Sequence, residues 1–349
     1  MIRCLQTSIR CDSSTLDKLF ECNRLSGQLW NDCLTLSKCY SLEHDKKWIN
    51  KSELQRLTKN SYPLHSQSIQ SVVHKYLFSR DAAKQAKLQG LSNRYPYKTK
   101  KHFNTKWVDK AFKVIDNHTL QLSLGLGRNK LIVHTTRSLE GLDIKEIELA
   151  YKKELKLSIT YDNGIEPIEN IGIHQVGVDL GEIHTMSCYC TNGESLIITG
   201  RKMRSIHRLR NKKLSELQKK LSHCQKGSRN YKKYMKAKRY LLTKSEEQLK
   251  DCLHKTTKQF VDWCVENEVK EVVLGEVQNV GNKTKKKKRT NRINRQKLSN
   301  WQVGKLKKYL EYKLKEKSIK ISSQEESYTT QQCPCCGRRY KPFGRYKRI

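Results

Sequence analysis

The sequence predicts an α+β protein of several domains: a small β-barrel with an inserted helical lobe, followed by an α/β domain. Three observations support this fold class. Alternating apolar and polar residues indicate strands at the N-terminus and in the middle of the chain, apolar residues at helical spacing lie between them, and short apolar strands alternate with long basic helices in the second half. A chain of 349 residues is long enough for two or three domains.

The N-terminal half begins with a strand and returns to strands after a helical stretch. Residues 1–12 alternate like a strand, and apolar side chains then recur at helical spacing over 13–90. Strand alternation resumes within 91–172, where Asn and Gly mark the turns. We therefore expect a helical lobe inserted into one antiparallel barrel or sheet that includes the N-terminal strand.

The next block, residues 173–332, predicts the order β-β-β-α-β-α-β. Its first three strands read VGVDLG, IHTMSCYC and ESLIITG. Two long basic helices follow, separated at Gly227–Ser228, and then come a strand (VKEVVLGEV), a basic loop, an amphipathic helix around Trp301 to Leu314 and a last strand (SIKISS). Three antiparallel strands followed by strands that are joined through helices are typical of an RNase H-like domain.

The charge balance predicts a polyanionic partner. The chain has 71 Lys and Arg against 34 Asp and Glu, a formal net charge of +37. Nucleic acid is the partner that such an excess favours, although a well-solvated basic protein is the simpler alternative. No apolar run approaches the roughly 18 residues of a membrane span, and the start lacks the apolar stretch of a secretion signal. We expect a cytoplasmic, nucleoid-associated protein with no membrane contact.

Two acidic residues end apolar strands of the predicted α/β sheet. Asp179 ends the first strand of this block and Glu276 ends the fourth, and each has a glycine within two residues. Adjacent carboxylates of this kind hold divalent ions during phosphodiester hydrolysis. Each acid alone is explained as well by a turn cap or a lysine partner. Together, at equivalent points of one sheet, they are candidate catalytic residues and Mg²⁺ ligands.

A basic segment lies between Glu276 and Trp301. Residues 281–300 carry nine Lys or Arg and no acid. A solvated loop and a contact with the nucleic-acid backbone both explain this composition. The candidate nucleic-acid-binding residues are Lys285, Lys286, Lys287, Lys288, Arg289, Arg292 and Arg295.

The run Cys333-Pro-Cys-Cys336-Gly has the spacing of a zinc knuckle. One knuckle supplies two ligands, so we predict that Cys333 and Cys336 form half of a Zn²⁺ site in a partial zinc ribbon over 333–349. A redox C-x-x-C is the competing interpretation, but it requires a thioredoxin-like context that the sequence does not indicate. The count of 13 cysteines is odd, which favours buried thiols and a metal site over a disulfide framework.

Two further sets of side chains are open to more than one interpretation. Three histidines of the second half are expected in the core or on the surface, namely His184, His207 and His254. Four aromatic residues are interleaved with lysines, and they either stack on bases or pack a linker onto the barrel: Tyr95, Tyr97, Phe103 and Trp107.

Several segments together resemble the TnpB family, the RNA-guided nucleases of bacterial and archaeal insertion sequences, which are related to compact type V CRISPR effectors. The matching segments are GVDLG (177–181), KGSRNYKK (226–233), LHKTTKQFV (253–261), LGEV (274–277), NWQVGKLKKYLEYK (300–313) and ESYTTQQCPCCG (326–337). The resemblance implies a wedge-like barrel interrupted by a recognition lobe, a RuvC nuclease domain and a zinc ribbon. It also implies a guide RNA derived from the element and a double-stranded DNA target.

By the same resemblance, Asp179 and Glu276 match the first two catalytic acids, and Cys333 and Cys336 match the first pair of zinc ligands. In the family a second C-x-x-C and a third aspartate follow a stretch like KPFGRYK, where this sequence reaches Ile349. We therefore expect an RNA-guided, Mg²⁺-dependent DNA endonuclease of a transposable element with impaired cleavage. The alternatives are a nuclease-inactive remnant that binds RNA and DNA, and a DNA-binding transposition accessory protein that needs no RNA. The oligomeric state is not predicted.

Overall fold

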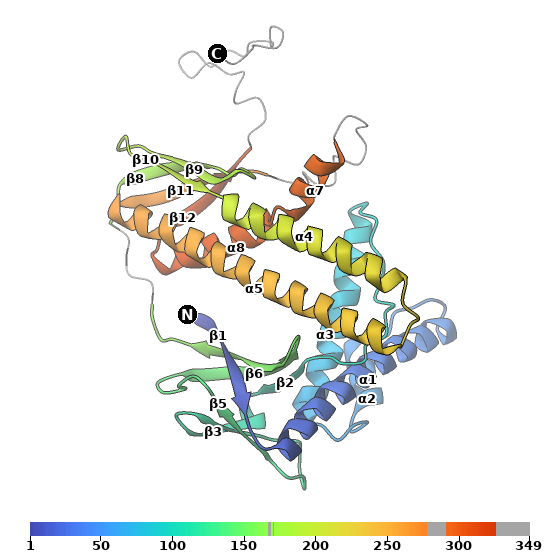
Figure 1. The fold of residues 1–349 in the computed structure, drawn as a ribbon. Coiled ribbons are helices and arrows are strands. Elements are labelled where there is room, and N and C mark those ends of the chain that lie inside the picture. The colour runs from blue at the N-terminus through green and yellow to red at the C-terminus, as the bar shows by residue number, and fades with distance from the viewer. Residues whose placement is uncertain (167–168, 170, 278–290, 326–349) are drawn as a thin grey trace. The chain divides into compact units, whose positions relative to one another are not determined.

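A computed structural model of the chain describes residues 1–166, 169, 171–277 and 291–325. Its internal contacts divide the chain into two units, Met1–Ile165 and Glu166–Ile349. Both units mix helices with strands (Figure 1), which confirms the α+β class.

The first unit begins with a strand, continues with three helices and ends with strands. Its elements are β1 (Ile2–Arg10), α1 (Ser13–Glu43), α2 (Lys51–Thr58), α3 (Ser66–Leu88), β2 (Thr105–Val108), the 3₁₀ turn η1 (Asp109–Ala111), β3 (Phe112–Asp116), β4 (Thr119–Leu122), β5 (Leu131–Thr135), β6 (Asp143–Tyr151) and β7 (Leu155–Asp162). Side-chain caps start the first two helices, because Asp12 accepts from the Thr15 N–H and Asn50 from the Glu53 N–H.

The strands of the first unit form a nearly closed barrel. The sheet order is β2-β6-β7-β1-β5-β4-β3, and every pair is antiparallel. The two edge strands, β2 and β3, are joined by the three residues of η1, so the sheet must curl far enough to bring its two edges near each other at this turn. The N-terminal strand β1 pairs with β7 and β5, as the sequence predicts.

The helices of this unit are fixed to the barrel by buried polar contacts. Asn23 of α1 accepts hydrogen bonds from the backbone N–H of Thr105 at 3.0 Å and from its hydroxyl at 2.9 Å. A Cβ at Gly27 would lie 3.0 Å from the backbone of His102, so a larger residue would require the linker to move away from α1. Trp107 is fully buried, and its indole N–H donates to the Ser123 carbonyl.

The second unit has the predicted order of elements. Each α of the predicted order β-β-β-α-β-α-β corresponds to a pair of helices in the structure. Its elements are β8 (His174–Asp179), β9 (His184–Cys190), β10 (Ser195–Thr199), α4 (Arg201–Ser222), α5 (Arg229–Glu266), β11 (Val269–Gly275), α7 (Arg292–Asn300), α8 (Val303–Glu316) and β12 (Lys320–Gln324). The break at Gly227–Ser228 is confirmed, and α4 and α5 lie side by side as an antiparallel pair (Figure 1). One expectation is wrong: residues 292–300 form a helix, capped by Asn291, and not a loop.

The sheet of the second unit has the order β10-β9-β8-β11-β12. The strands β8, β9 and β10 are antiparallel, whereas β11 runs parallel to both β8 and β12. Apolar side chains of α5, α8 and the sheet form one core, which includes Phe260, Leu310 and Val272. Lys313 of α8 also donates to the His254 carbonyl of α5, so the two helices are joined by polar contacts as well.

The sequence favours buried thiols over a disulfide framework, and it predicts no membrane span. All ten cysteines of the described ranges are free thiols, and several of them are buried. No helix in those ranges is long and apolar enough to span a membrane.

Candidate active site

The two predicted catalytic acids lie at neighbouring strand ends. Asp179 is the last residue of β8, and Glu276 follows the last residue of β11. In the parallel register Val178 is opposite Leu274, so Glu276 lies one residue beyond the level of Asp179. With strands about 4.8 Å apart and a rise of about 3.3 Å per residue, the two Cα atoms are about 6 Å apart. Both residues are exposed to solvent.

The backbone that carries Glu276 is held from both sides. Its N–H donates to the Gln324 carbonyl of β12 at 2.7 Å. The Lys307 ammonium of α8 donates to the carbonyl of the preceding residue, Gly275, at 3.3 Å. The end of β11 is therefore fixed in the sheet and against α8, which limits where the Glu276 carboxylate can lie.

The loop that follows Asp179 is equally constrained. Leu180 is buried, and a Cβ at Gly181 would lie 2.6 Å from the His184 carbonyl oxygen, so this tight turn requires glycine. The N–H of Gly200 donates to the Ile183 carbonyl at 2.7 Å, which joins the loop to the start of α4.

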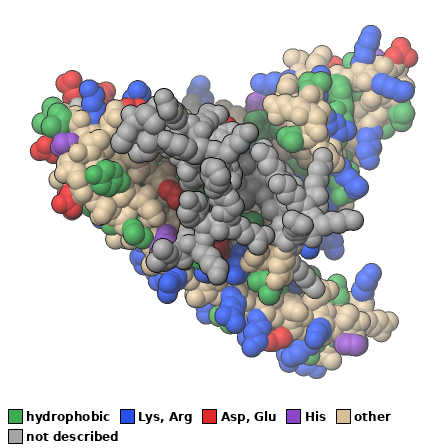
Figure 2. Space-filling model, turned by 90° about the horizontal axis from the view of Figure 1, so that it is seen from above, with side chains coloured by type: hydrophobic (Ala, Val, Ile, Leu, Met, Phe, Trp, Pro, Cys, Tyr) green, Lys and Arg blue, Asp and Glu red, His purple; other side chains and the backbone are tan. Residues whose placement is uncertain are grey.

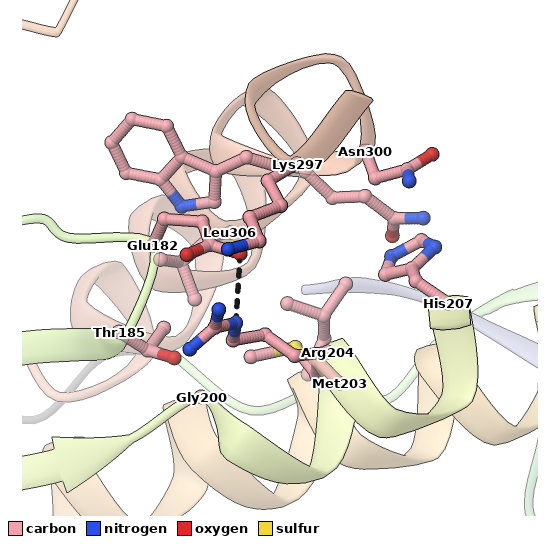
Figure 3. A pocket seen from close by; sticks show the side chains of 12 residues that line it. Glu182, Thr185, Gly200, Met203, Arg204, His207, Lys297, Asn300 and Leu306 are labelled. Atoms are coloured by element: carbon pink, nitrogen blue, oxygen red, sulfur yellow. Dashed lines mark ion pairs between the residues drawn. The ribbon is translucent and has the colours of Figure 1, made fainter. Parts of the chain in front are cut away.

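An ion pair fixes the same loop to α4. The Arg204 Nε lies 3.0 Å from the Glu182 Oε1, and both side chains are only partly exposed. They line a cavity that also contacts Met203, Leu306 and Trp301. Figure 3 shows Glu182 and Arg204 facing each other across this cavity. The pair positions the turn that begins at Asp179.

His207 lies at the edge of the same cavity, with only 9% of its surface exposed. Burial, and then the positive charges of Arg210 and Lys305, lower the pKa of the imidazole to about 4. The ring is therefore neutral at pH 7. Of the other two histidines, His184 is exposed and His254 stacks on Tyr309 with ring centroids 4.3 Å apart.

Three residues near the acids were not predicted from the sequence. Glu182 and Arg204 form the ion pair, and Glu325 follows β12 at the level of Glu276, because Gln324 is opposite Gly275. Glu325 could have been found by the same criterion as Asp179, an acid at the end of a strand. In the described part of the chain, no three His, Cys, Asp or Glu side chains are grouped so as to hold a metal ion.

Two of the nine predicted basic and zinc-binding residues, Arg292 and Arg295, belong to the described part of the chain. Lys285 to Arg289, Cys333 and Cys336 lie outside the described residues. Arg292 begins α7, and nothing is described of its side chain; Arg295 is exposed on the same helix. On the face shown in Figure 2, Lys and Arg side chains are spread over much of the visible described surface.

The four aromatic residues that were expected either to stack on bases or to pack the linker onto the barrel differ in their surroundings. Phe103 packs on Trp30 with ring centroids 4.8 Å apart and Trp107 is fully buried, so these two serve the core of the first unit. Tyr95 contacts the Trp48 ring, and Tyr97 is 53% exposed. Of the four, Tyr97 has the most exposed side chain, and the Lys98 Nζ lies 5.8 Å from the centre of its ring.

Comparisons with known proteins connect this geometry to a family. Residues 158–281 match the family model of the probable transposase OrfB_IS605, and residues 304–348 match that of the Cas12f1-like TNB domain. The TnpB-like protein MJ0751 of Methanocaldococcus jannaschii is 28% identical over 179 residues, which are 49% of this chain and 59% of that relative. This chain is a member of the TnpB family.

The fold of this TnpB-family chain is also found in a solved structure. A Cas12f1 protein, solved by cryo-electron microscopy in complex with sgRNA and target DNA, matches with a TM-score of 0.66 at 13% identity, over 95% of this chain and 77% of that chain. A CRISPR-Cas12f ternary complex matches with a TM-score of 0.38 at 14% identity, over 92% and 73% of the two chains.

Proposed function

We propose that this chain is an RNA-guided DNA endonuclease of a transposable element, in which Asp179 and Glu276 bind a divalent metal ion at the phosphodiester that is cut. The observation that carries the proposal is the parallel pairing of β8 with β11, which brings the two acids to adjacent strand ends. Membership of the TnpB family supports the nuclease class. The sheet order supports a RuvC-type, RNase H-like domain as the catalytic unit.

The donor set at the strand ends fits Mg²⁺. This ion prefers oxygen ligands and is commonly held by one or two carboxylates together with substrate phosphates and water. Two exposed carboxylates on fixed backbones about 6 Å apart provide such a set. Bound there, the ion would neutralise charge on the phosphate that is transferred. The chain itself contributes the position of the two carboxylates, which the sheet, α8 and the Glu182–Arg204 pair hold in place.

The partners that we propose are a guide RNA and double-stranded DNA. The Cas12f1 structure that shares this fold contains an sgRNA and target DNA. In guided recognition base pairing reads the target, while the protein holds the backbone of the nucleic acids through positive charge. The net charge of +37 supports this role and a location at the chromosome.

A cleavage assay with matched variants tests the proposal. The chain is expressed with its flanking element, copurified RNA is sequenced, and cutting of DNA complementary to that RNA is measured in Mg²⁺ and in EDTA. We expect Asp179→Asn and Glu276→Gln to lose cutting. The control Glu194→Gln changes an exposed acid in the turn before β10, at the other end of the sheet, and should cut like the parent chain.

Two other outcomes of these experiments would support the alternative functions. RNA-dependent DNA binding without cutting in the parent chain would leave a guided binding protein. The absence of a discrete RNA, with duplex binding unchanged after RNase treatment, would instead indicate the accessory protein and refute the guided role.

We also propose that Cys333 and Cys336 bind Zn²⁺. Thiolates at this spacing are typical ligands of structural zinc. Metal analysis of chelator-washed protein should show less zinc in Cys333→Ser than in Cys224→Ser, a control at a half-exposed free thiol. Equal zinc in the two variants would contradict the assignment.

A further inference from the structure

A basic groove runs between α4 and α7 beside the loop that follows Asp179. It has a volume of about 720 Å³. Its walls include Arg201, Arg208 and Lys212 from α4 and Gln296, Lys297 and Asn300 from α7. Among the residues that the structure describes, no acidic side chain lines it.

The basic residues of α4 form one stripe along the groove. Arg201, Arg204, Arg208 and Lys212 follow one another at intervals of three or four residues, which puts them on one face of the helix. The stripe is about 16 Å long at 1.5 Å per residue. Three of them, all but Arg204, are exposed. Cations in the first turn of a helix oppose its dipole, so Arg201 does not stabilise the helix end.

The groove is built by contacts between its walls. The Arg210 guanidinium donates to the Asn300 Oδ1 at 3.1 Å, and His207 is buried between the two helices. Arg204 is neutralised by Glu182, whereas Arg201, Arg208 and Lys212 have no ion pair within the described ranges. Like charges held together on a rigid surface without counter-charge favour an anionic ligand.

The position of the groove connects it to the two acids. Its α4 end contains Arg204, whose partner Glu182 lies three residues after Asp179. A ligand in the groove therefore extends towards the end of β8. Its cationic and amide side chains suit phosphate and sugar oxygens.

We propose that the α4–α7 groove binds the phosphodiester backbone of a single nucleic-acid strand and leads it to Asp179 and Glu276. Both walls carry cationic or amide side chains, so a strand between them is contacted from two sides, whereas a duplex would reach one wall only. A stripe of about 16 Å is long enough to contact a few consecutive phosphates of one strand, because these are spaced by about 3.4 Å or more. The claim that the strand is led to the two acids rests on the proposed function. The claim that the groove binds a strand does not.

The test measures binding without metal or guide. The full chain is freed of RNA and titrated in EDTA with fluorescent oligothymidylate and oligouridylate of about ten nucleotides, and with a duplex of the same length. The groove variant is Arg201→Ala/Arg208→Ala/Lys212→Ala. The control, Lys202→Ala/Lys213→Ala/Lys219→Ala, removes the same charge from exposed positions of α4 outside the groove.

Loss of three phosphate contacts should lower the slope of log affinity against log salt by about 2, at about 0.7 per contact for a single strand. Between 50 and 200 mM salt the groove variant should therefore lose roughly twentyfold less affinity than the parent chain. The control variant should keep the parent slope. The DNA and RNA oligonucleotides together show which strand the groove prefers.

Equal effects of the two triple variants would overturn the proposal, because they would show a response to net charge alone. Duplex binding that falls as much as single-strand binding would overturn it as well. The outcome is separable from that of the proposed function. A groove variant with weakened binding in a chain that never cuts DNA supports the groove alone, and unchanged binding in a chain that cuts supports the nuclease alone.

Discussion

The exchange Asp179→Asn should separate a metal-binding role from a structural one. In the structure Asp179 is exposed at the end of β8, with the Cα of Glu276 about 6 Å away. Two carboxylates about 4–6 Å apart repel each other by no more than about 1 kcal/mol in water, and salt weakens this further. Without metal, the variant should therefore be as stable as the parent chain or slightly more stable.

With metal the order should reverse. At a Mg²⁺ concentration ten times the dissociation constant, binding to the folded state adds about 1.4 kcal/mol to the free energy of unfolding. In a domain of 150 to 250 residues, each kcal/mol raises the melting temperature by about 2–4 °C. The parent chain should gain about 3–6 °C, whereas Asp179→Asn should gain little.

Thermal unfolding in EDTA and in a Mg²⁺ titration measures both effects. Glu276→Gln should behave like Asp179→Asn, and the double variant should lose no more than either, because both acids serve one ion. Glu194→Gln, at the opposite end of the sheet, should keep the full Mg²⁺ response. A Mg²⁺ shift in Asp179→Asn equal to that of the parent chain would refute the assignment of the site.

Two further predictions concern the scaffold of the site. Gly200→Ala should lower the free energy of unfolding by about 1–3 kcal/mol, as measured by urea denaturation. The new Cβ would lie 2.5 Å from the hydroxyl of Thr185, which is a buried and stiff side chain. The control Gly304→Ala has open space around its Cβ and should not destabilise the protein. His207 has a pKa lowered to about 4 by burial, so the folded state disfavours its protonation, and stability should fall as the pH drops from about 6.5 towards 4. His207→Leu should show a smaller fall over that range, and an unchanged pH profile would contradict the buried neutral ring.

The positions of the two acids were predictable because they depend on local signals. An apolar run that ends in an acid, with a glycine within two residues, identifies a strand end, and the order of the elements indicates which strands are neighbours. The parallel pairing of β8 with β11 agrees with that reasoning. The break between α4 and α5 was predictable for the same reason, since Gly227–Ser228 lies within the break.

The Glu182–Arg204 pair and the groove were not predictable, because they depend on how helices are oriented. Arg204 lies 22 residues after Glu182, on a helix that carries basic residues all around its surface. Which of these faces the loop is decided by the turn at Gly200 and by the packing of α4. The helix α7 was missed because its residues are polar and basic without an apolar stripe, a composition that also describes a loop.

The acids and the groove have opposite charges, and this predicts that metal and strand binding are coupled. In EDTA the carboxylates of Asp179 and Glu276 repel a phosphate that leaves the groove near Glu182, whereas a bound Mg²⁺ attracts it. Mg²⁺ should therefore increase single-strand affinity, and by linkage the strand should increase Mg²⁺ affinity by the same factor. Asp179→Asn should remove this coupling while it raises strand affinity in EDTA. Strand affinity that is independent of Mg²⁺ in the parent chain would mean that the groove and the acids do not act on the same strand.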